Sequence, residues 1–267
     1  MELVRAGSLG EAFAARSARP GATLLAGGTD LMVDVNLNGF RPDTVITLRR
    51  VAELTERSRD YLGAGVTYAD LTTSHDRALV ELSRTVGSPQ IRNVGTIGGN
   101  LGTASPAGDT LPFLAAIDAV VVLGSEAGTR RVPWDLFLTG PKETALGQDE
   151  IILGVELPSD RPIRQAFSKV GVRQAMVIAT VSCCVVRGED GDTRVALGAV
   201  GPTVLRAHQA EVMISHEAAP SEAALAEFSR LVSAEALPIT DHRSTAEYRR
   251  HAVGVISRRA LERCLAR

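Results

Sequence analysis

The sequence predicts an α+β protein built in two parts. Up to about residue 157, short strand-type and helix-type segments follow one another without a fixed order. From about Ala166 the pattern changes, because two alternating segments rich in β-branched residues come first and two helices follow them. Pro158, Asp160 and Pro162 mark a linker between the two parts. We therefore expect one domain over 1–160 and a second over 165–267.

The first helix is predicted over Ser8 to Ala18. Ser8 and Glu11 have the spacing of a capping box, and Arg19-Pro20-Gly21 ends the segment. Apolar runs bounded by turn residues then predict strands over Thr23 to Ala26, Thr44 to Leu48 and Tyr61 to Ala64. Around them we expect an amphipathic turn over Leu31 to Val35, a short helix capped by Thr67-x-x-Asp70 and a longer helix over Asp76 to Val86.

Residues 91–111 interrupt this series. Five glycines and a run of Thr, Ser and Asn replace any hydrophobic period there. We expect an irregular loop, and a loop of about 15 residues or more inside a compact domain is usually functional. Regular structure resumes with a helix over Leu111 to Ile117 and strands over Ala119 to Leu123 and Ile151 to Leu157.

The second part begins with strands over Val177 to Val186 and Thr193 to Val200. Glu189-Asp190-Gly191-Asp192 is the predicted turn between them. Two helices follow, over Ser221 to Val232 and over Thr245 to Leu265, the latter starting at a capping box of Ser244 and Glu247.

Composition excludes several classes of function. The 267 residues carry 29 basic and 31 acidic side chains, a net charge of −2, whereas nucleic-acid binders that act through bulk charge are strongly basic. The longest apolar stretch, Leu111 to Leu123, contains Asp118 and is shorter than the roughly 20 residues of a membrane span. The charged N-terminus lacks the apolar core of a signal peptide, so we expect a cytoplasmic protein.

Cysteine and histidine spacing predicts no metal centre. Cys183, Cys184 and Cys264 form no C-x-x-C motif and are too few for a Cys₄ iron–sulfur site. We expect the adjacent pair to be successive residues of a buried strand. The five histidines include no H-x-x-x-H pair, which argues against zinc.

Two glycine-rich segments are candidates for binding a phosphate. In the first, a strand leads into Gly27-Gly28, with Thr29 as a hydroxyl donor and Asp30 as a helix cap. In the second, Gly98-Gly99-Asn100 can present backbone N–H groups in the same way, with Thr96, Thr103 and Ser105 as further donors. Asp109 is acidic and would repel phosphate, so it suits sugar or ring hydroxyls.

The alternative is that each glycine pair is only a tight turn. Neither segment matches a standard nucleotide motif: G-x-x-x-x-G-K-[ST] is absent, and Gly63-Ala64-Gly65 lacks the third glycine of G-x-G-x-x-G. A P-loop ATPase and a Rossmann dehydrogenase are therefore both disfavoured.

The two segments together resemble those of a known family. A-G-G-T-D-L (26–31), T-I-G-G-N-L (96–101) and T-A-S-P-A-G-D (103–109) are similar to motifs of the FAD-binding medium subunit of molybdenum hydroxylases, which include xanthine and carbon monoxide dehydrogenases. The likeness extends to N-L-N-G-F-R-P-D-T-V-I-T-L (36–48), D-E-I-I-L-G-V-E-L-P (149–158) and the region of Lys169. It implies a vanillyl-alcohol oxidase/PCMH-type FAD-binding fold of two α+β subdomains, about 1–55 and 56–160. It also implies a CO dehydrogenase flavoprotein-like C-terminal domain with a three-stranded sheet and helices.

The resemblance also implies the cofactor-binding residues. The pyrophosphate of FAD would be wrapped by Leu24, Leu25, Ala26, Gly27, Gly28, Thr29, Asp30 and Leu31. Its second side would be lined by Thr96, Ile97, Gly98, Gly99 and Asn100, with a hydroxyl contact from Thr103. Asp109 would bind ribityl or ribose hydroxyls, Ile152 would pack near the adenine or the flavin ring, and Lys169 would lie at the pyrimidine edge. The stretch Met176 to Ile178 falls where relatives cover the flavin face.

The function implied is electron transfer. A [2Fe–2S] small subunit would reduce the FAD, a molybdopterin large subunit would hydroxylate the substrate, and the assembly would be a dimer of heterotrimers. No catalytic residue and no metal ligand is expected in this chain. Two alternatives are a free-standing flavin reductase or oxidase of the same fold and a non-redox adaptor subunit.

Overall fold

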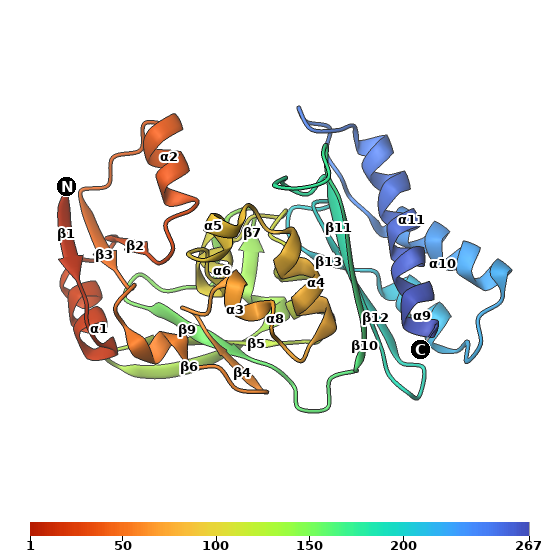
Figure 1. Cartoon of the computed structure of the whole chain (residues 1–267), viewed down its shortest axis with the longest axis horizontal. Coiled ribbons are helices and arrows are strands. Elements are labelled where there is room, and N and C mark those ends of the chain that lie inside the picture. The colour runs from red at the N-terminus through yellow and green to blue at the C-terminus, as the bar shows by residue number, and fades with distance from the viewer. Residues whose placement is uncertain (267) are drawn as a thin grey trace.

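Three sheets lie in a row along the molecule in the computed structural model, which describes residues 1–266 (Figure 1). The first is a parallel sheet of order β1-β3-β2, formed by β1 (Glu2–Arg5), β3 (Thr44–Thr47) and β2 (Thr23–Leu25). Helix α1 (Leu9–Ala18) packs on it through Ala15, which meets Ile46 in a small core. Helix α2 (Leu31–Leu37) follows β2 and has no buried residue.

The second sheet is antiparallel, in the order β4-β9-β5-β6. Its strands are β4 (Tyr61–Gly63), β9 (Ile151–Glu156), β5 (Val120–Ser125) and β6 (Gly128–Pro133). The chain also forms the short helices α3 (Tyr68–Leu71), α5 (Pro89–Arg92), α6 (Ile97–Thr103), α7 (Leu111–Ala116) and α8 (Trp134–Phe137), the longer α4 (Arg77–Thr85) and the small hairpin β7 (Leu138–Gly140) and β8 (Glu143–Thr144). Ile97 and Leu101 of α6 are fully buried in the core that this sheet shares with the helices.

The third sheet belongs to the C-terminal part and has the order β10-β11-β12-β13. Its strands are β10 (Arg164–Val170), β11 (Val181–Arg187), β12 (Thr193–Gly198) and the two-residue β13 (Leu205–Arg206). Helices α9 (His208–Ser215), α10 (Glu222–Glu235) and α11 (Ala246–Leu265) cover one of its faces (Figure 1). The fold is thus the predicted α+β class, with a short fourth strand added to the three expected in this sheet.

Both faces of the third sheet are buried. Cys183 and Val185 of β11 belong to the core under the C-terminal helices, whereas Cys184 and Val186 belong to the core of the preceding part. This explains why β11 is apolar at successive positions rather than at alternate ones. The prediction that the two cysteines are neighbours on a buried strand is confirmed, and burial raises the pKa of the Cys183 thiol to about 12.

The connection between β9 and β10 is held by ion pairs. The side chain of Arg161 is only 6% exposed and donates to both carboxylate oxygens of Asp76 at 2.9 Å, and to Asp60 at 2.9 Å. Gln165 also donates to Asp76 at 2.9 Å. The expected linker is therefore attached to α4 by hydrogen-bonded charges rather than free in solvent.

Several local predictions need correction. Segment 91–111 is irregular only in part, because Thr96 caps α6 and the two glycines lie within that helix, whereas 104–110 contains no helix or strand. The strand expected from Val177 starts only at Val181, and β1, β6, β10 and α9 were not predicted. Thr245, not Ser244, caps α11 by accepting a hydrogen bond from the Tyr248 N–H.

Other predicted elements are confirmed to within two residues at each end, except that α10 continues three residues beyond the predicted end at Val232, to Glu235. Ser8 accepts from the Glu11 N–H as expected, but the Glu11 carboxylate accepts from Gly7 rather than from Ser8. Thr67 and Asp70 form the full reciprocal capping box of α3. Across residues 1–266, none of the helices has the length and apolar character needed to cross a bilayer.

Candidate cofactor-binding cleft

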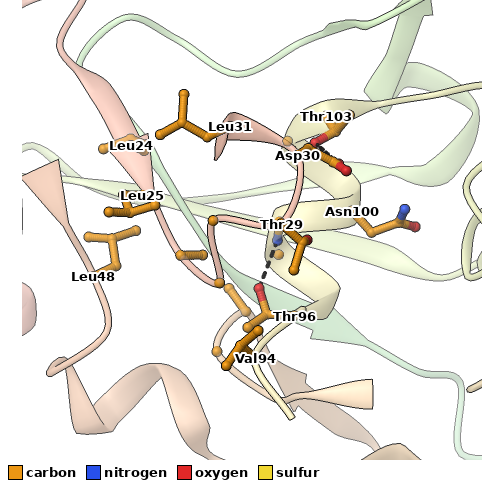
Figure 2. Close-up of a pocket in the computed structure, with 18 of the residues that line it drawn as sticks. Leu24, Leu25, Thr29, Asp30, Leu31, Leu48, Val94, Thr96, Asn100 and Thr103 are labelled. Carbon is orange, nitrogen blue, oxygen red and sulfur yellow. Dashed lines mark hydrogen bonds between the residues drawn. The ribbon is translucent and has the colours of Figure 1, made fainter. Parts of the chain in front are cut away.

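A cleft of about 900 Å³ runs between the first two sheets and is lined on one side by residues 176–178 of the C-terminal part. This volume lies near the top of the roughly 300–1,000 Å³ range of small-molecule and cofactor sites. Its walls are the turn between β2 and α2, the first turns of α6, and β9 (Figure 2). The cleft therefore brings together both glycine-rich segments.

The turn from β2 to α2 exposes a row of backbone donors. Across residues 1–266, none of the N–H groups from Gly27 to Leu31 donates a hydrogen bond to another residue. Gly28 has φ +78°, which favours glycine and lets successive N–H groups face one side. Gly27 lies against the next segment so closely that a Cβ there would be 1.9 Å from the Val94 carbonyl oxygen. These donors suit an anion such as a pyrophosphate.

The second glycine segment differs from the expectation that it offers free N–H groups. Ile97 donates to the Val66 carbonyl at 3.0 Å, Gly98 to that of Ala64 at 2.9 Å, and Asn100 to that of Thr96 at 3.0 Å. The Gly99 N–H donates to the Thr96 hydroxyl at 3.0 Å (Figure 2). Because these donors are used to build α6 and to join it to the segment after β4, this wall offers side chains and the bare surface of Gly99 instead.

One side-chain hydrogen bond ties the two walls together. The Thr103 hydroxyl donates to the Asp30 carboxylate at 2.8 Å (Figure 2). Asp30 makes no capping bond at the start of α2, so the expectation that its side chain caps that helix is wrong. Its carboxylate instead fixes the turn that carries the free N–H groups against α6.

A buried polar network lies at the end of α6. The Thr110 hydroxyl is fully buried and donates to the Asn100 amide oxygen. Tyr68 of α3 is 5% exposed and also lines the cleft. Burial, and to a smaller extent the charge of Asp109, raises the pKa of Tyr68, so its hydroxyl stays protonated near neutral pH.

Asp109 and Lys169 form a buried ion pair. The Lys169 ammonium donates to Asp109 Oδ2 at 2.5 Å and to the Thr85 carbonyl at 3.2 Å. The two charged side chains are 9% and 6% exposed, respectively. Burial raises the pKa of Asp109, while the adjacent ammonium lowers it. The other oxygen, Oδ1, is buried and has no partner among the described residues.

Most of the predicted binding residues line the cleft. These are Leu24, Leu25, Ala26, Gly27, Gly28, Thr29, Asp30, Leu31, Thr96, Gly98, Gly99, Asn100, Thr103, Asp109 and Ile152. Ile97 does not, because its side chain is fully buried in the core beneath α6. Lys169 is not among the lining residues; its ammonium is held by Asp109 and by the Thr85 carbonyl oxygen.

Met176, Val177 and Ile178, the stretch that the family resemblance singled out, also line the cleft. Arg16, Arg49, Tyr68 and Lys142 line it as well and were not predicted. Lys142 is exposed and has φ +61°. It and Lys169 are the two lysines of the sequence, so this scarcity was a signal that could have drawn attention to it. Tyr68 and Arg16 carry no comparable local signal.

Comparison with known proteins identifies the two parts of the chain. Residues 1–160 match the family model described as the FAD binding domain in molybdopterin dehydrogenase. The chain belongs to this family of FAD-binding subunits. Residues 166–264 match the CO dehydrogenase flavoprotein C-terminal domain.

Individual relatives support this assignment to the family of FAD-binding subunits. The carbon monoxide dehydrogenase medium chain of Hydrogenophaga pseudoflava is 32% identical over 92% of this chain and 90% of its own length. The nicotinate dehydrogenase FAD-subunit of Eubacterium barkeri is 39% identical over 59% of this chain and 58% of its own length. A structure of the Hydrogenophaga pseudoflava carbon monoxide dehydrogenase lacking the Mo-pyranopterin moiety matches with a TM-score of 0.91 at 31% identity, covering 100% of this chain and 97% of the other.

FAD is the cofactor of this domain, and two features of the cleft fit it. The row of free N–H groups from Gly27 to Leu31 matches the two negative charges of its pyrophosphate. The unpartnered Asp109 Oδ1 matches a hydroxyl or N–H donor on the rest of the molecule. The chain is an oxidoreductase subunit, and its residues hold the group that carries the redox chemistry.

Proposed function

We propose that this subunit takes electrons from a partner iron–sulfur subunit and passes them to an external acceptor. The observation that carries the proposal is the set of free backbone donors in the turn between β2 and α2, together with the buried, unpartnered Oδ1 of Asp109, a residue that lines the cleft. These are groups that bind and orient a dinucleotide. They do not form a nucleophile–base pair of the kind that transforms a substrate.

Each wall of the cleft has a separate task in this proposal. The Gly27 to Leu31 turn binds the pyrophosphate, and the lack of a side chain at Gly99 admits it close to α6. Ile152 packs against an apolar part of the cofactor. FAD, when bound, supplies the redox chemistry by accepting electrons singly and delivering them in pairs. The protein orients it and sets the electrostatics around it.

The partners that we propose are a small subunit with [2Fe–2S] clusters and a molybdopterin-containing large subunit, assembled as a dimer of heterotrimers. The carbon monoxide dehydrogenase and nicotinate dehydrogenase relatives are themselves named as a medium chain and a FAD-subunit, which supports a multi-subunit complex here. A free-standing flavin reductase and a non-redox adaptor are the two alternatives that the experiments must exclude.

The first test is the identity of the cofactor. We expect the purified chain to release FAD, not FMN, on heating, at about one per chain, because the free N–H row is placed for a pyrophosphate. Chromatography of the released flavin measures this directly. Release of FMN, or a colourless chain after expression with riboflavin, contradicts the assignment of the cleft.

Co-purification separates the remaining alternatives. The proposal expects the tagged chain to bring down an iron–sulfur and a molybdopterin subunit, and substrate turnover to require all three. A yellow chain that turns over a substrate alone is a free-standing enzyme, and a complex that keeps its activity without flavin makes this chain an adaptor.

A further inference from the structure

We infer that Arg16 binds the adenosine half of the cofactor, by donating a hydrogen bond to it at the end of the cleft that the first sheet forms. The inference deepens the proposed function of the cleft and rests on it. It gives a role to a buried cation that the pyrophosphate-binding turn does not use.

Arg16 is a buried charge without a counter-charge. It lies in the last turn of α1 and is 8% exposed. None of the ion pairs within residues 1–266 includes it. Burial lowers the pKa of Arg16 and the charge of Asp149 opposes this, but a guanidinium stays protonated near neutral pH. A buried charge is unfavourable unless acceptors surround it, so this one needs more acceptors than the chain supplies.

Most donors of this guanidinium are unused. Nη1 donates to the Ala22 carbonyl oxygen, immediately before β2. Nε is buried and has no partner among the described residues. Nη2 has no partner there either, but unlike Nε it keeps accessible surface. Because Arg16 lines the cleft, Nη2 is the donor that a molecule bound in the cleft can reach.

The cleft wall at this end is otherwise apolar. Leu24 and Leu48 pack on the small core that contains Ala22, and both line the cleft. They lie beside Leu25, on the other side of the glycine turn from Asn100 (Figure 2). An apolar wall with one polar group is typical of a site for a small aromatic ligand. Adenine fits it, because its faces are apolar and its N3 and N7 atoms accept hydrogen bonds.

The exposure of the two ends of the cleft indicates which half of FAD lies at Arg16. The three sheets lie in a row, with Arg16 beside the first and Met176 and Ile178 in the C-terminal part (Figure 1). Met176 and Ile178 are 52% and 56% exposed. In the proposed function the flavin exchanges electrons with a partner and with an acceptor, so it needs this exposed end. The adenosine takes no part in electron transfer and can occupy the buried end.

Binding of FAD and of ADP to the full chain freed of flavin tests the inference. Flavin fluorescence follows FAD, and ADP is measured by its competition with FAD. Arg16→Met should weaken both molecules by the same factor, about 10- to 100-fold, the fold-change for loss of a hydrogen bond to a charged group. Arg19→Met is the matched control, because it removes a neighbouring arginine that pairs with Glu2 at 2.7 Å at the surface. It should change neither affinity.

Arg16→Lys separates ligand binding from support of the fold. Lysine keeps the charge and can donate to the Ala22 carbonyl, but one ammonium cannot occupy the positions of both Nη1 and Nη2. We expect this variant to bind FAD and ADP about 10-fold more weakly than the wild type, and it decides the question even where Arg16→Met does not fold. If Arg16 only holds the Ala22 carbonyl, Arg16→Lys binds both molecules as the wild type does, and the inference is wrong.

The ADP measurement identifies the half of the cofactor that Arg16 contacts. Weaker binding of FAD with unchanged binding of ADP would place Arg16 against the flavin and overturn the inference. Unchanged affinity for both molecules would also overturn it, as would a wild-type chain that binds FAD but does not bind millimolar ADP. A wild-type chain that binds no FAD contradicts the proposed function itself, and this result is distinct from the other three.

Discussion

Replacing Gly99 by valine is expected to reduce FAD affinity by more than 100-fold while the chain stays folded. A Cβ at this position meets a single neighbouring atom, the Thr96 hydroxyl at 3.2 Å, and otherwise projects into the open space of the cleft that Gly99 lines. The branched side chain would then occupy volume that the cofactor needs, against a wall whose glycines admit close approach.

Gly99→Ala separates the effect on FAD binding from the effect on stability. Alanine has the higher helix preference inside α6, but its Cβ would lie 3.2 Å from the Thr96 hydroxyl that caps the helix, so we expect the free energy of unfolding of the FAD-free chain to change by less than about 1 kcal/mol. The same methyl group should weaken FAD binding. Thermal unfolding of the FAD-free chain and a fluorescence titration with FAD measure the two effects. Stoichiometric FAD in a folded Gly99→Val chain would show that the cofactor does not pass along this wall.

Lys169→Met is expected to lower the free energy of unfolding by about 3–5 kcal/mol at pH 8, because it leaves the buried Asp109 carboxylate without its counter-charge. Tyr68 of α3 is also coupled to Asp109, but its raised pKa keeps the phenol protonated across this range. The FAD-free chain isolates this effect from any change in cofactor binding.

The loss of stability in Lys169→Met should be smaller at low pH than at high pH. Burial raises the pKa of Asp109 and Lys169 opposes that rise, so the variant retains only the raising cause. An acid whose pKa is higher in the folded than in the unfolded state binds more protons when folded, so stability falls as pH rises through that interval. The deficit of Lys169→Met should therefore shrink between pH 8 and pH 5.

Chemical denaturation at the two pH values measures the deficit. The double variant Asp109→Asn/Lys169→Met buries a neutral pair and should show a smaller, pH-independent loss. An equal deficit of Lys169→Met at pH 5 and pH 8 would mean that Asp109 is not the group left uncompensated.

The parts of the fold that local chemistry determines could be predicted from the sequence. Thr67 and Asp70 specify a helix start within four residues, and the β-branched run of β11 specifies a buried strand. The exposed strand β6 was missed because its side chains, including Arg130 and Arg131, are mostly in solvent and show no apolar alternation.

The glycine segment 91–111 shows why pattern alone failed at the site. Gly98 lies in α6 although glycine is a poor helix former. A Cβ at this position would be only 2.5 Å from the Ala64 Cβ. Close packing of α6 on the chain after β4 requires glycine, and this tertiary cause overrides its poor intrinsic preference for helix. A sequence window around residue 98 does not contain Ala64.

The candidate site, like the fold, could be predicted from the sequence only in part. The strand–Gly-Gly–helix pattern at Gly27 and Gly28 indicated an anion-binding turn, and the free N–H groups lie there. The pairing of Asp109 with Lys169 joins residues 60 positions apart in different parts of the molecule. Neither residue carries a local mark of the other, so the sequence did not reveal this ion pair. The place at the pyrimidine edge that the family resemblance implies for Lys169 stays a prediction.

Electron transfer from the partner is the central claim, and anaerobic rapid mixing tests it most directly. The FAD-loaded chain would be mixed with the chemically reduced iron–sulfur subunit that co-purifies with it, while the visible absorption of both centres is followed. We predict that the flavin absorption bleaches as the clusters reoxidise, and that the isolated chain stays oxidised when offered the substrate of the complex. Flavin that remains oxidised in the presence of the reduced partner, or that is reduced by substrate in the isolated chain, would contradict the account.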